Sequence, residues 1–229
     1  MTAQARTAGT VNEQRINTFV ARVYLLMAVG FVVTALTSVW FASSMTRMIK
    51  FVSNPWLAWG LFFVQIMLVV ALSASVMRLK PIVAALIFLL YAALTGVTLS
   101  SIFLVYSNEQ IASVFWICAG TFFIASVVGL VSKRDMSKGG GAIAMLLLGW
   151  LIAWMFSLFF PDSNFNWFLN FVGILLFVGL TVRDSNRIKA LGQQVESQPA
   201  RGGLMVIGAL QLYLDFINLF LLMLRASSR

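Results

Sequence analysis

The chain has 229 residues, of which 61% are hydrophobic and 10% are charged, with a formal net charge of +9 and a mean hydropathy of +0.94. Soluble globular chains carry roughly 45–50% apolar and about 25% charged residues, so this composition indicates an integral membrane protein and excludes a soluble enzyme. One cysteine, Cys118, and no histidine exclude disulfide frameworks, zinc sites and histidine-based catalytic triads.

The first 22 residues are polar and lack the short apolar core of a signal peptide. We therefore predict a solvated cytoplasmic arm over 1–22 and a single transmembrane domain over 23–229. A helix needs about 20 mainly apolar residues to cross a bilayer, and this rule predicts an all-α bundle of seven membrane-spanning helices. The predicted spans are 23–42, 56–76, 81–106, 111–131, 142–160, 167–182 and 204–224.

Turn residues separate these spans, as in 53–55 (SNP) and 139–141 (GGG). With seven spans, twelve of the sixteen Lys and Arg residues fall on the side of the N-terminus. The positive-inside rule then predicts a cytoplasmic N-terminus and an external C-terminus. Because the basic residues lie at the ends of apolar segments, they indicate topology, and no nucleic-acid partner is expected.

The last predicted span carries a carboxylate, Asp215, near its middle. A charge there costs roughly 2.5–3.5 kcal/mol on insertion scales, so it must face protein or water. Gln211 and Asn218 share its helical face at i−4 and i+3 spacing. We interpret this face as part of an ion pathway; a purely structural hydrogen-bond network is the alternative.

Asp184 ends the sixth predicted span on the cytoplasmic side, and Arg78 closes the second span on the same side. An Arg78–Asp184 ion pair is therefore possible, whereas an ordinary solvated carboxylate is the alternative. In the third span, Ala92, Gly96 and Ser100 recur at i+4 spacing, which is typical of close helix packing.

Several segments resemble the Bax-inhibitor-motif family of membrane proteins, in particular its bacterial inner-membrane branch. The longest and most specific is 208–220 (GALQLYLDFINLF), and the resemblance covers nearly the whole chain in the expected order. The other matching segments are 24–27 (YLLM) with Gly30, 91–103 (YAALTGVTLSSIF), 133–137 (KRDMS), and Asp184 with 188–189 (IK).

This resemblance implies a seven-helix bundle whose last helix is enclosed by the other six, and a pH-sensitive calcium leak. It implies that Asp184 and Asp215 act as the pH sensor and that Arg78 is a latch for one of them. The chain departs from the family pattern at Arg183, where relatives often have tyrosine, and Arg183 could compete with Arg78 for Asp184. It also departs at Gln65, near a position where some relatives carry an acid.

The residues are consistent with such a leak, because two nearby carboxylates in a low-dielectric medium do not both ionise easily. Calcium prefers several oxygen ligands, and Asp184, Asp215, Asn218 and backbone carbonyls would form a weak, transient calcium site. Protonation would weaken the latch but also remove attraction for calcium, so the sign of the pH response stays open. No cofactor and no enzymatic activity are expected; the expected partners are the lipid bilayer, protons and calcium as the transported ion.

Two other functions remain open. The first is a non-conducting membrane regulator that binds a membrane protease or a stress-response partner protein. The second is a proton-coupled transporter of a small solute.

Overall fold

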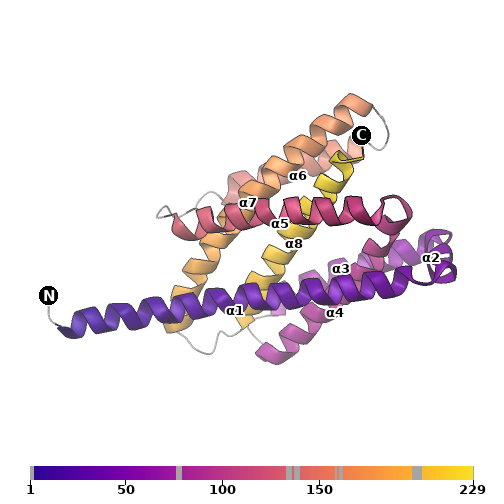
Figure 1. The fold of residues 1–229 in the computed structure, drawn as a ribbon. Helices are drawn as coiled ribbons and strands as arrows, with labels where there is room; N and C mark the ends of the chain where they lie inside the picture. Colours follow the sequence, from indigo (N-terminus) through magenta and orange to yellow (C-terminus); the bar gives the residue numbers. More distant parts are fainter. Residues whose placement is uncertain are drawn as a thin grey trace. The chain divides into compact units, whose positions relative to one another are not determined.

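The computed structural model describes residues 3–75, 79–132, 136, 140–157, 159, 162–197 and 203–228. Within these ranges every regular element is a helix (Figure 1). The elements are α1 (Ala3–Ala42), α2 (Met45–Val52), α3 (Pro55–Ser75), α4 (Pro81–Leu99), the 3₁₀ helix η1 (Ser100–Leu104), α5 (Asn108–Val131), α6 (Gly140–Ser157), α7 (Ser163–Ser197) and α8 (Gly203–Ala226).

Helix boundaries follow the turn chemistry of the sequence. Pro55 and Pro81 are the first residues of α3 and α4, where a missing N–H costs no helical hydrogen bond. The Ser107 hydroxyl accepts a hydrogen bond from the Gln110 N–H at 3.2 Å at the start of α5. Before α7, Asp162 Oδ1 accepts from two backbone N–H groups at 2.7 and 2.8 Å. Each side chain satisfies donors that a helix start leaves unpaired.

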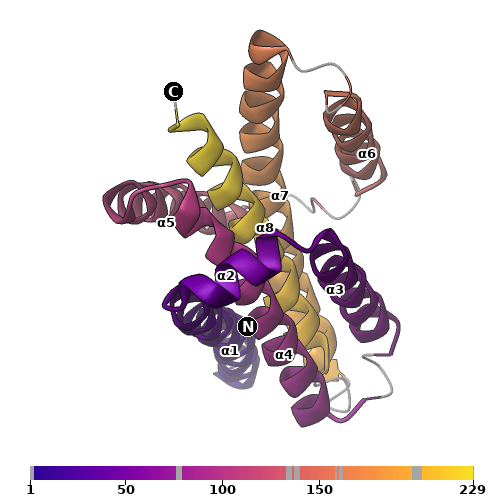
Figure 2. The same ribbon diagram turned by 90° about the vertical axis from the view of Figure 1, so that its right-hand side faces the viewer.

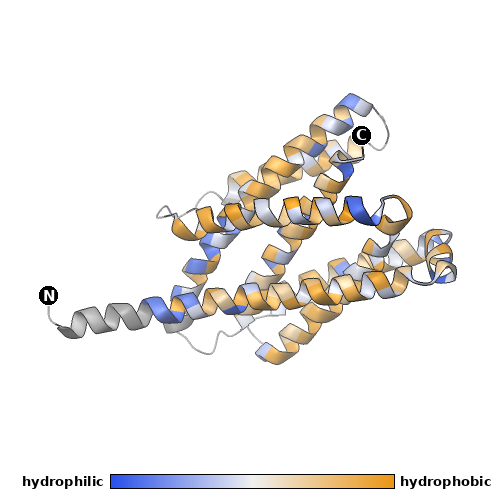
Figure 3. Ribbon diagram, in the orientation of Figure 1, coloured by the Kyte–Doolittle hydropathy of each residue, from blue (hydrophilic) through white to orange (hydrophobic). Residues whose placement is uncertain are grey.

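Each of the seven predicted spans overlaps a helix, and the all-α class is confirmed. Six helical segments are long and apolar enough to cross a membrane, and one shorter apolar helix covers Gly141–Ser157. Apolar residues line these helices along most of their length (Figure 3). Of the six, α8 is the most buried: 56% of its apolar window is buried, against 11–33% for the others. Its enclosure by six neighbours remains a prediction.

Three features differ from the sequence prediction. Helix α1 begins at Ala3 and runs through the predicted boundary between residues 22 and 23, and α2 was not predicted. The sixth span was predicted to end at residue 182, but α7 continues to Ser197. Asp184 therefore lies inside a helix, and its predicted position at a helix end was wrong.

The chain divides into two compact units. Unit 1 comprises Met1–Tyr106 with Leu191–Tyr213, and unit 2 comprises Ser107–Ala190 with Leu214–Arg229. Helices α7 and α8 each contribute one part to unit 1 and one to unit 2.

In unit 1, α4 packs against α1 and α3 (Figure 2). At Gly96 on α4, a Cβ atom would overlap the Thr37 hydroxyl and lie 2.5 Å from the Thr34 carbonyl oxygen. Only glycine permits this approach of α4 to α1, so the prediction of close packing by the small-residue stripe is confirmed at this position.

In unit 2, α5 approaches α7 at Gly129, where a Cβ atom would overlap the Val182 carbonyl and lie 2.9 Å from the Ser185 Cβ. Helix α6 is tied to α7 by the Trp150 indole N–H, which donates to the Leu169 carbonyl at 2.8 Å. These contacts place the central part of α7 against α5.

Candidate functional site

Asp184 on α7 and Asp215 on α8 are both buried in unit 2, each with 6% of its surface exposed. The two carboxylates are close enough to act on each other electrostatically, and Arg183 acts on both. Burying two acids together is costly, because each desolvated charge carries a large penalty. Ionisable residues within membrane helices are therefore rare and are functional candidates. The structure thus brings together the two aspartates that the sequence singled out.

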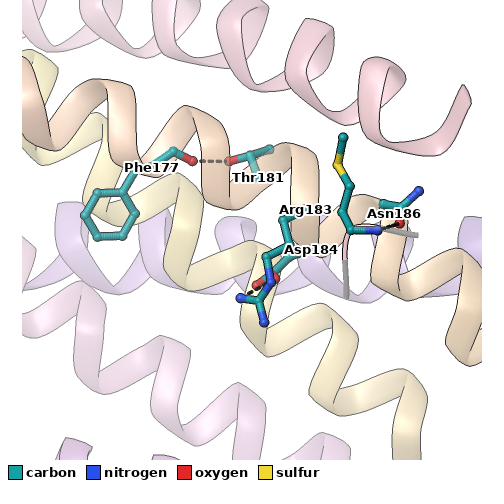
Figure 4. A network of polar contacts seen from close by, with 6 residues as sticks. Phe177, Thr181, Arg183, Asp184 and Asn186 are labelled. Carbon is teal, nitrogen blue, oxygen red and sulfur yellow. Dashed lines mark hydrogen bonds and ion pairs between the residues drawn. The ribbon is translucent and has the colours of Figure 1, made fainter. Parts of the chain in front are cut away.

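Arg183 forms an ion pair with Asp184, with 3.6 Å between Nη1 and Oδ1 (Figure 4). The Arg183 side chain is 17% exposed and that of Asp184 is 9% exposed. The separation exceeds that of an ordinary charge-assisted hydrogen bond, about 2.7–2.9 Å. Arg187, one turn further along α7, also acts on Asp184 electrostatically. The basic side chains near Asp184 therefore include two from its own helix.

Three buried atoms of this cluster have no hydrogen-bond partner within the described part of the chain: Arg183 Nε, Asp184 Oδ1 and Asp215 Oδ2. Buried polar atoms are nearly always paired, and an unpaired one costs about 1–3 kcal/mol. Two carboxylate oxygens without donors are suited to accept a proton or to approach a cation. The cluster therefore combines an ion pair with buried charged atoms whose hydrogen bonding is incomplete within the described residues.

The two amide side chains of the predicted polar face of α8 differ in their hydrogen bonding. Asn218 donates its amide N–H to the Leu214 carbonyl of its own helix at 2.8 Å, so its amide oxygen is the group left for a ligand. Gln211 keeps a buried Oε1 without a hydrogen-bond partner among the described residues. Both residues lie on the same continuous helix as Asp215, and their supporting role remains a prediction.

Arg78, the predicted latch, lies outside the described residues, so its pairing with Asp184 also remains a prediction. Gln65 is described: its amide N–H donates to the Thr95 hydroxyl at 3.2 Å, and the Thr98 hydroxyl donates to its oxygen at 3.4 Å. These partners belong to unit 1, so Gln65 serves to join α3 to α4 there.

Sequence reasoning missed a set of polar contacts that flank Asp184. Asn186 donates to the carbonyls of Gly129 and Ser132 at 3.1 and 3.3 Å. It also accepts from the Met136 N–H at 3.1 Å (Figure 4). Lys189 donates to the Leu130 carbonyl at 3.1 Å. These side chains of α7 satisfy carbonyls at the end of α5, which a helix leaves unpaired. The sequence prediction ended the sixth span at residue 182, before these residues, and so did not reveal this role.

Tyr213 was also missed, although it lies two residues before Asp215. It is fully buried, and its hydroxyl lies 2.6 Å from that of Thr34 on α1. Its ring stacks on Phe31 at 5.1 Å between centroids and meets Phe88 and Tyr91 edge-on at 5.5 and 6.0 Å. A tyrosine in an apolar span signals such a partner, because its hydroxyl must be hydrogen-bonded when buried.

Among the described residues, no group of three or more His, Cys, Asp or Glu side chains gathers in a way that could hold a metal ion. A cation near Asp184 and Asp215 would therefore take most of its ligands from amide oxygens, backbone carbonyls or water. Tight calcium sites use many oxygen ligands and several carboxylates, and this pair supplies only two carboxylates.

The apolar spans and the buried, charged cluster define a multi-pass α-helical membrane protein. Over residues 16–228 the chain matches the family described as "Inhibitor of apoptosis-promoting Bax1". It belongs to this family, the Bax inhibitor family, and the resemblance stated from its motifs is confirmed.

Curated bacterial relatives align with nearly the whole chain. "Inner membrane protein YbhL" of Escherichia coli (strain K12) is 39% identical over 212 residues, which cover 92% of this chain and 91% of the relative. An uncharacterized protein of Borreliella burgdorferi is 37% identical over 212 residues, covering 91% and 90%. An uncharacterized membrane protein of Streptococcus pyogenes serotype M3 is 33% identical over 225 residues, covering 96% of each chain.

Proposed function

We propose that this protein is a pH-sensitive calcium (cation) leak channel, gated by the protonation state of Asp184 and Asp215. The observation that supports the proposal is the cluster of two buried carboxylates from α7 and α8, each with an oxygen that lacks a hydrogen-bond partner among the described residues, and an adjacent arginine. Such intramembrane acids are typical of ion pathways and proton relays. The fold by itself does not specify a function, so the proposal rests on the charged cluster.

Gating would follow from the charge of the pair. When Asp184 is ionised, it attracts Arg183 and, by prediction, Arg78. Protonation removes that attraction and also relieves the repulsion between the two carboxylates. Each change alters the balance of forces between α7 and α8, so the pair acts as a proton switch in a chain without histidine.

Permeation would rely on weak coordination. Two carboxylates, the amide oxygen of Asn218 and nearby carbonyls supply the oxygen ligands that calcium prefers. Since the described residues offer no larger acidic cluster, a bound ion would be released readily. We further propose that the protein resides in the bacterial cytoplasmic (inner) membrane, a location supported by the name of its relative YbhL.

The proposal is tested by calcium flux into dye-loaded proteoliposomes across a pH series, with wild type beside Asp215→Asn and Asp184→Asn. Asp162→Asn is a matched control, because Asp162 is exposed and caps α7 through Oδ1. We expect wild type and the control to conduct with the same pH profile. Both site variants should lose the pH dependence, because an amide cannot titrate.

Other outcomes would identify other functions. If folded wild-type protein gives no flux above that of empty liposomes at any pH, the channel proposal fails, and a regulator that binds a membrane-protein partner becomes the better interpretation. Saturable, proton-coupled exchange of a solute would instead indicate a transporter.

A further inference from the structure

Helix α2 connects α1 and α3, which are both long and apolar enough to cross the membrane. It contacts α1, α3 and η1 within unit 1 (Figure 2). Its eight residues extend about 12 Å at 1.5 Å per residue, far less than the roughly 30 Å of the hydrocarbon core. Because it joins two crossing helices, α2 lies at the membrane surface where they emerge.

The side chains of α2 fall on distinct faces of the helix. Met48 is 4% exposed, and the Phe51 ring packs edge-on against Phe41 at 5.8 Å. Met45, Ile49 and Val52 follow i, i+4, i+7 spacing and are 55–61% exposed. One apolar face is therefore packed against the protein, while an adjacent apolar face is uncovered.

The polar face of α2 carries Thr46 and Lys50, which are both exposed, and Arg47. Arg47 donates to the Trp40 carbonyl at 2.6 Å and to the Ser43 hydroxyl at 3.1 Å, and its guanidinium lies 4.1 Å from the Trp40 ring centroid. These contacts fix α2 at the end of α1. They also place a tryptophan beside the basic residues, as at a membrane–water interface.

The basic residues of α2 have no acidic counterpart nearby in the sequence. Between Glu13 and Glu109 the chain contains no aspartate or glutamate, so α1 beyond its first part, α3, α4 and η1 supply no carboxylate. A partner of complementary charge must come from outside these segments. Phosphate groups of anionic lipids meet this requirement directly beside an uncovered apolar face.

We propose that α2 is an interfacial anchor that binds anionic phospholipid. Met45, Ile49 and Val52 enter the outer part of the acyl region, while Lys50 and the outer edge of Arg47 meet headgroup phosphates. The helix thereby sets the depth at which α1 and α3 end. This inference does not depend on the proposed channel function.

The first test measures immersion depth by spin labelling in nanodiscs. In a Cys118→Ser background, single cysteines at positions 45, 46, 49, 50 and 52 are labelled and compared for collision with oxygen and with a water-soluble nickel complex. We expect labels at 45, 49 and 52 to favour oxygen and labels at 46 and 50 to favour nickel. Five labels that all favour nickel, or all favour oxygen, would overturn the proposal.

The second test addresses the headgroup, using the label at position 49 in phosphatidylcholine discs with and without phosphatidylglycerol. Phosphatidylglycerol should increase the oxygen preference of the label, Lys50→Gln should reduce that increase, and Thr46→Lys should enlarge it. Both substitutions lie at exposed positions, so they leave the packing of α2 intact. If phosphatidylglycerol has no effect on the parent protein, the assignment of anionic lipid as the ligand is wrong.

Discussion

Buried polar side chains in this protein differ in how completely they are hydrogen-bonded. Asn218 and Asn186 have their amide N–H groups paired with backbone carbonyls. By contrast, Asp184, Asp215 and Arg183 retain buried atoms without hydrogen-bond partners in the described segments. Two neutral side chains, Gln211 and Ser126, also keep a buried atom without such a partner, but desolvation is most costly for the charged groups. This higher cost is the residue-level reason for assigning the proposed function to the two aspartates first.

Arg183 should tune the pH response of the proposed channel. Arg183→Gln removes a positive charge 3.6 Å from the Asp184 carboxylate, so Asp184 should take up a proton more readily. We expect the midpoint of the flux–pH profile to move toward higher pH, on the order of one unit. Arg225→Gln, which removes an exposed arginine, should leave the midpoint in place. A profile unchanged by Arg183→Gln would exclude Arg183 from the switch.

The Tyr213 hydroxyl should contribute to stability rather than to gating. Tyr213→Phe keeps the ring contacts with Phe31 and Phe88 but removes the 2.6 Å hydrogen bond to Thr34. We expect a loss of about 1 kcal/mol in the free energy of unfolding, measured by denaturation in detergent. Tyr106→Phe, at a half-buried position, is the control and should be close to neutral. Equal effects of the two substitutions would contradict the assigned role.

At the scale of elements, α7 carries Asp184 and also supplies side chains that cap the C-terminal end of α5. The side chains of Asn186 and Lys189 satisfy carbonyls at the C-terminal end of α5, and Gly129 brings the two backbones together. These contacts lie within a turn or so of Asp184. The position of the carboxylate in unit 2 therefore depends on how α5 and α7 pack.

Glycine at position 129 should be required for this packing. In Gly129→Ala the new Cβ overlaps the Val182 carbonyl, so α5 and α7 must separate. We expect a destabilisation of about 1–3 kcal/mol, measured by thermal or chemical unfolding in detergent. The matched control is Gly120→Ala on the same helix, where a Cβ meets nothing within 4 Å. If Gly129→Ala is as well tolerated as Gly120→Ala, the close approach of α5 to α7 is not required.

At the scale of the whole molecule, topology depends on α6. Its apolar part, Gly141–Ser157, extends about 25 Å at 1.5 Å per residue, somewhat less than the hydrocarbon core. A helix of this length crosses if the bilayer thins locally or if flanking residues reach the interface. A crossing α6 makes seven spans and puts the two termini on opposite sides.

We expect α6 to cross and the C-terminus to be external, because only an odd number of spans gives the observed asymmetry of Lys and Arg. Reporter fusions measure this directly. Alkaline phosphatase fused after Arg229 should be active, and green fluorescent protein fused there should be dark. The opposite pair of results would mean an even number of crossings, and α6 would then be a helix that does not span.

Much of this organisation could be predicted from the amino-acid sequence. Long apolar runs are nearly sufficient to predict membrane helices, because a backbone in lipid must satisfy its own hydrogen bonds. Asp215 was found for a similar reason, because an acid in an apolar segment requires a special environment, whereas Asp184 was assigned to the site through the family resemblance. The motif around Asp215 indicated the family, which the comparisons confirm.

The tertiary structure determined the contacts between helices, which no local sequence pattern specifies. The sixth span was predicted to end at residue 182, yet α7 continues to Ser197, and the side chains of Asn186 and Lys189 find partners on α5. The Tyr213 hydroxyl is hydrogen-bonded to that of Thr34, although the two residues are 179 positions apart in sequence. Hydropathy describes how a residue partitions between water and lipid. These side chains instead contact another helix, and only the fold specifies which helix that is.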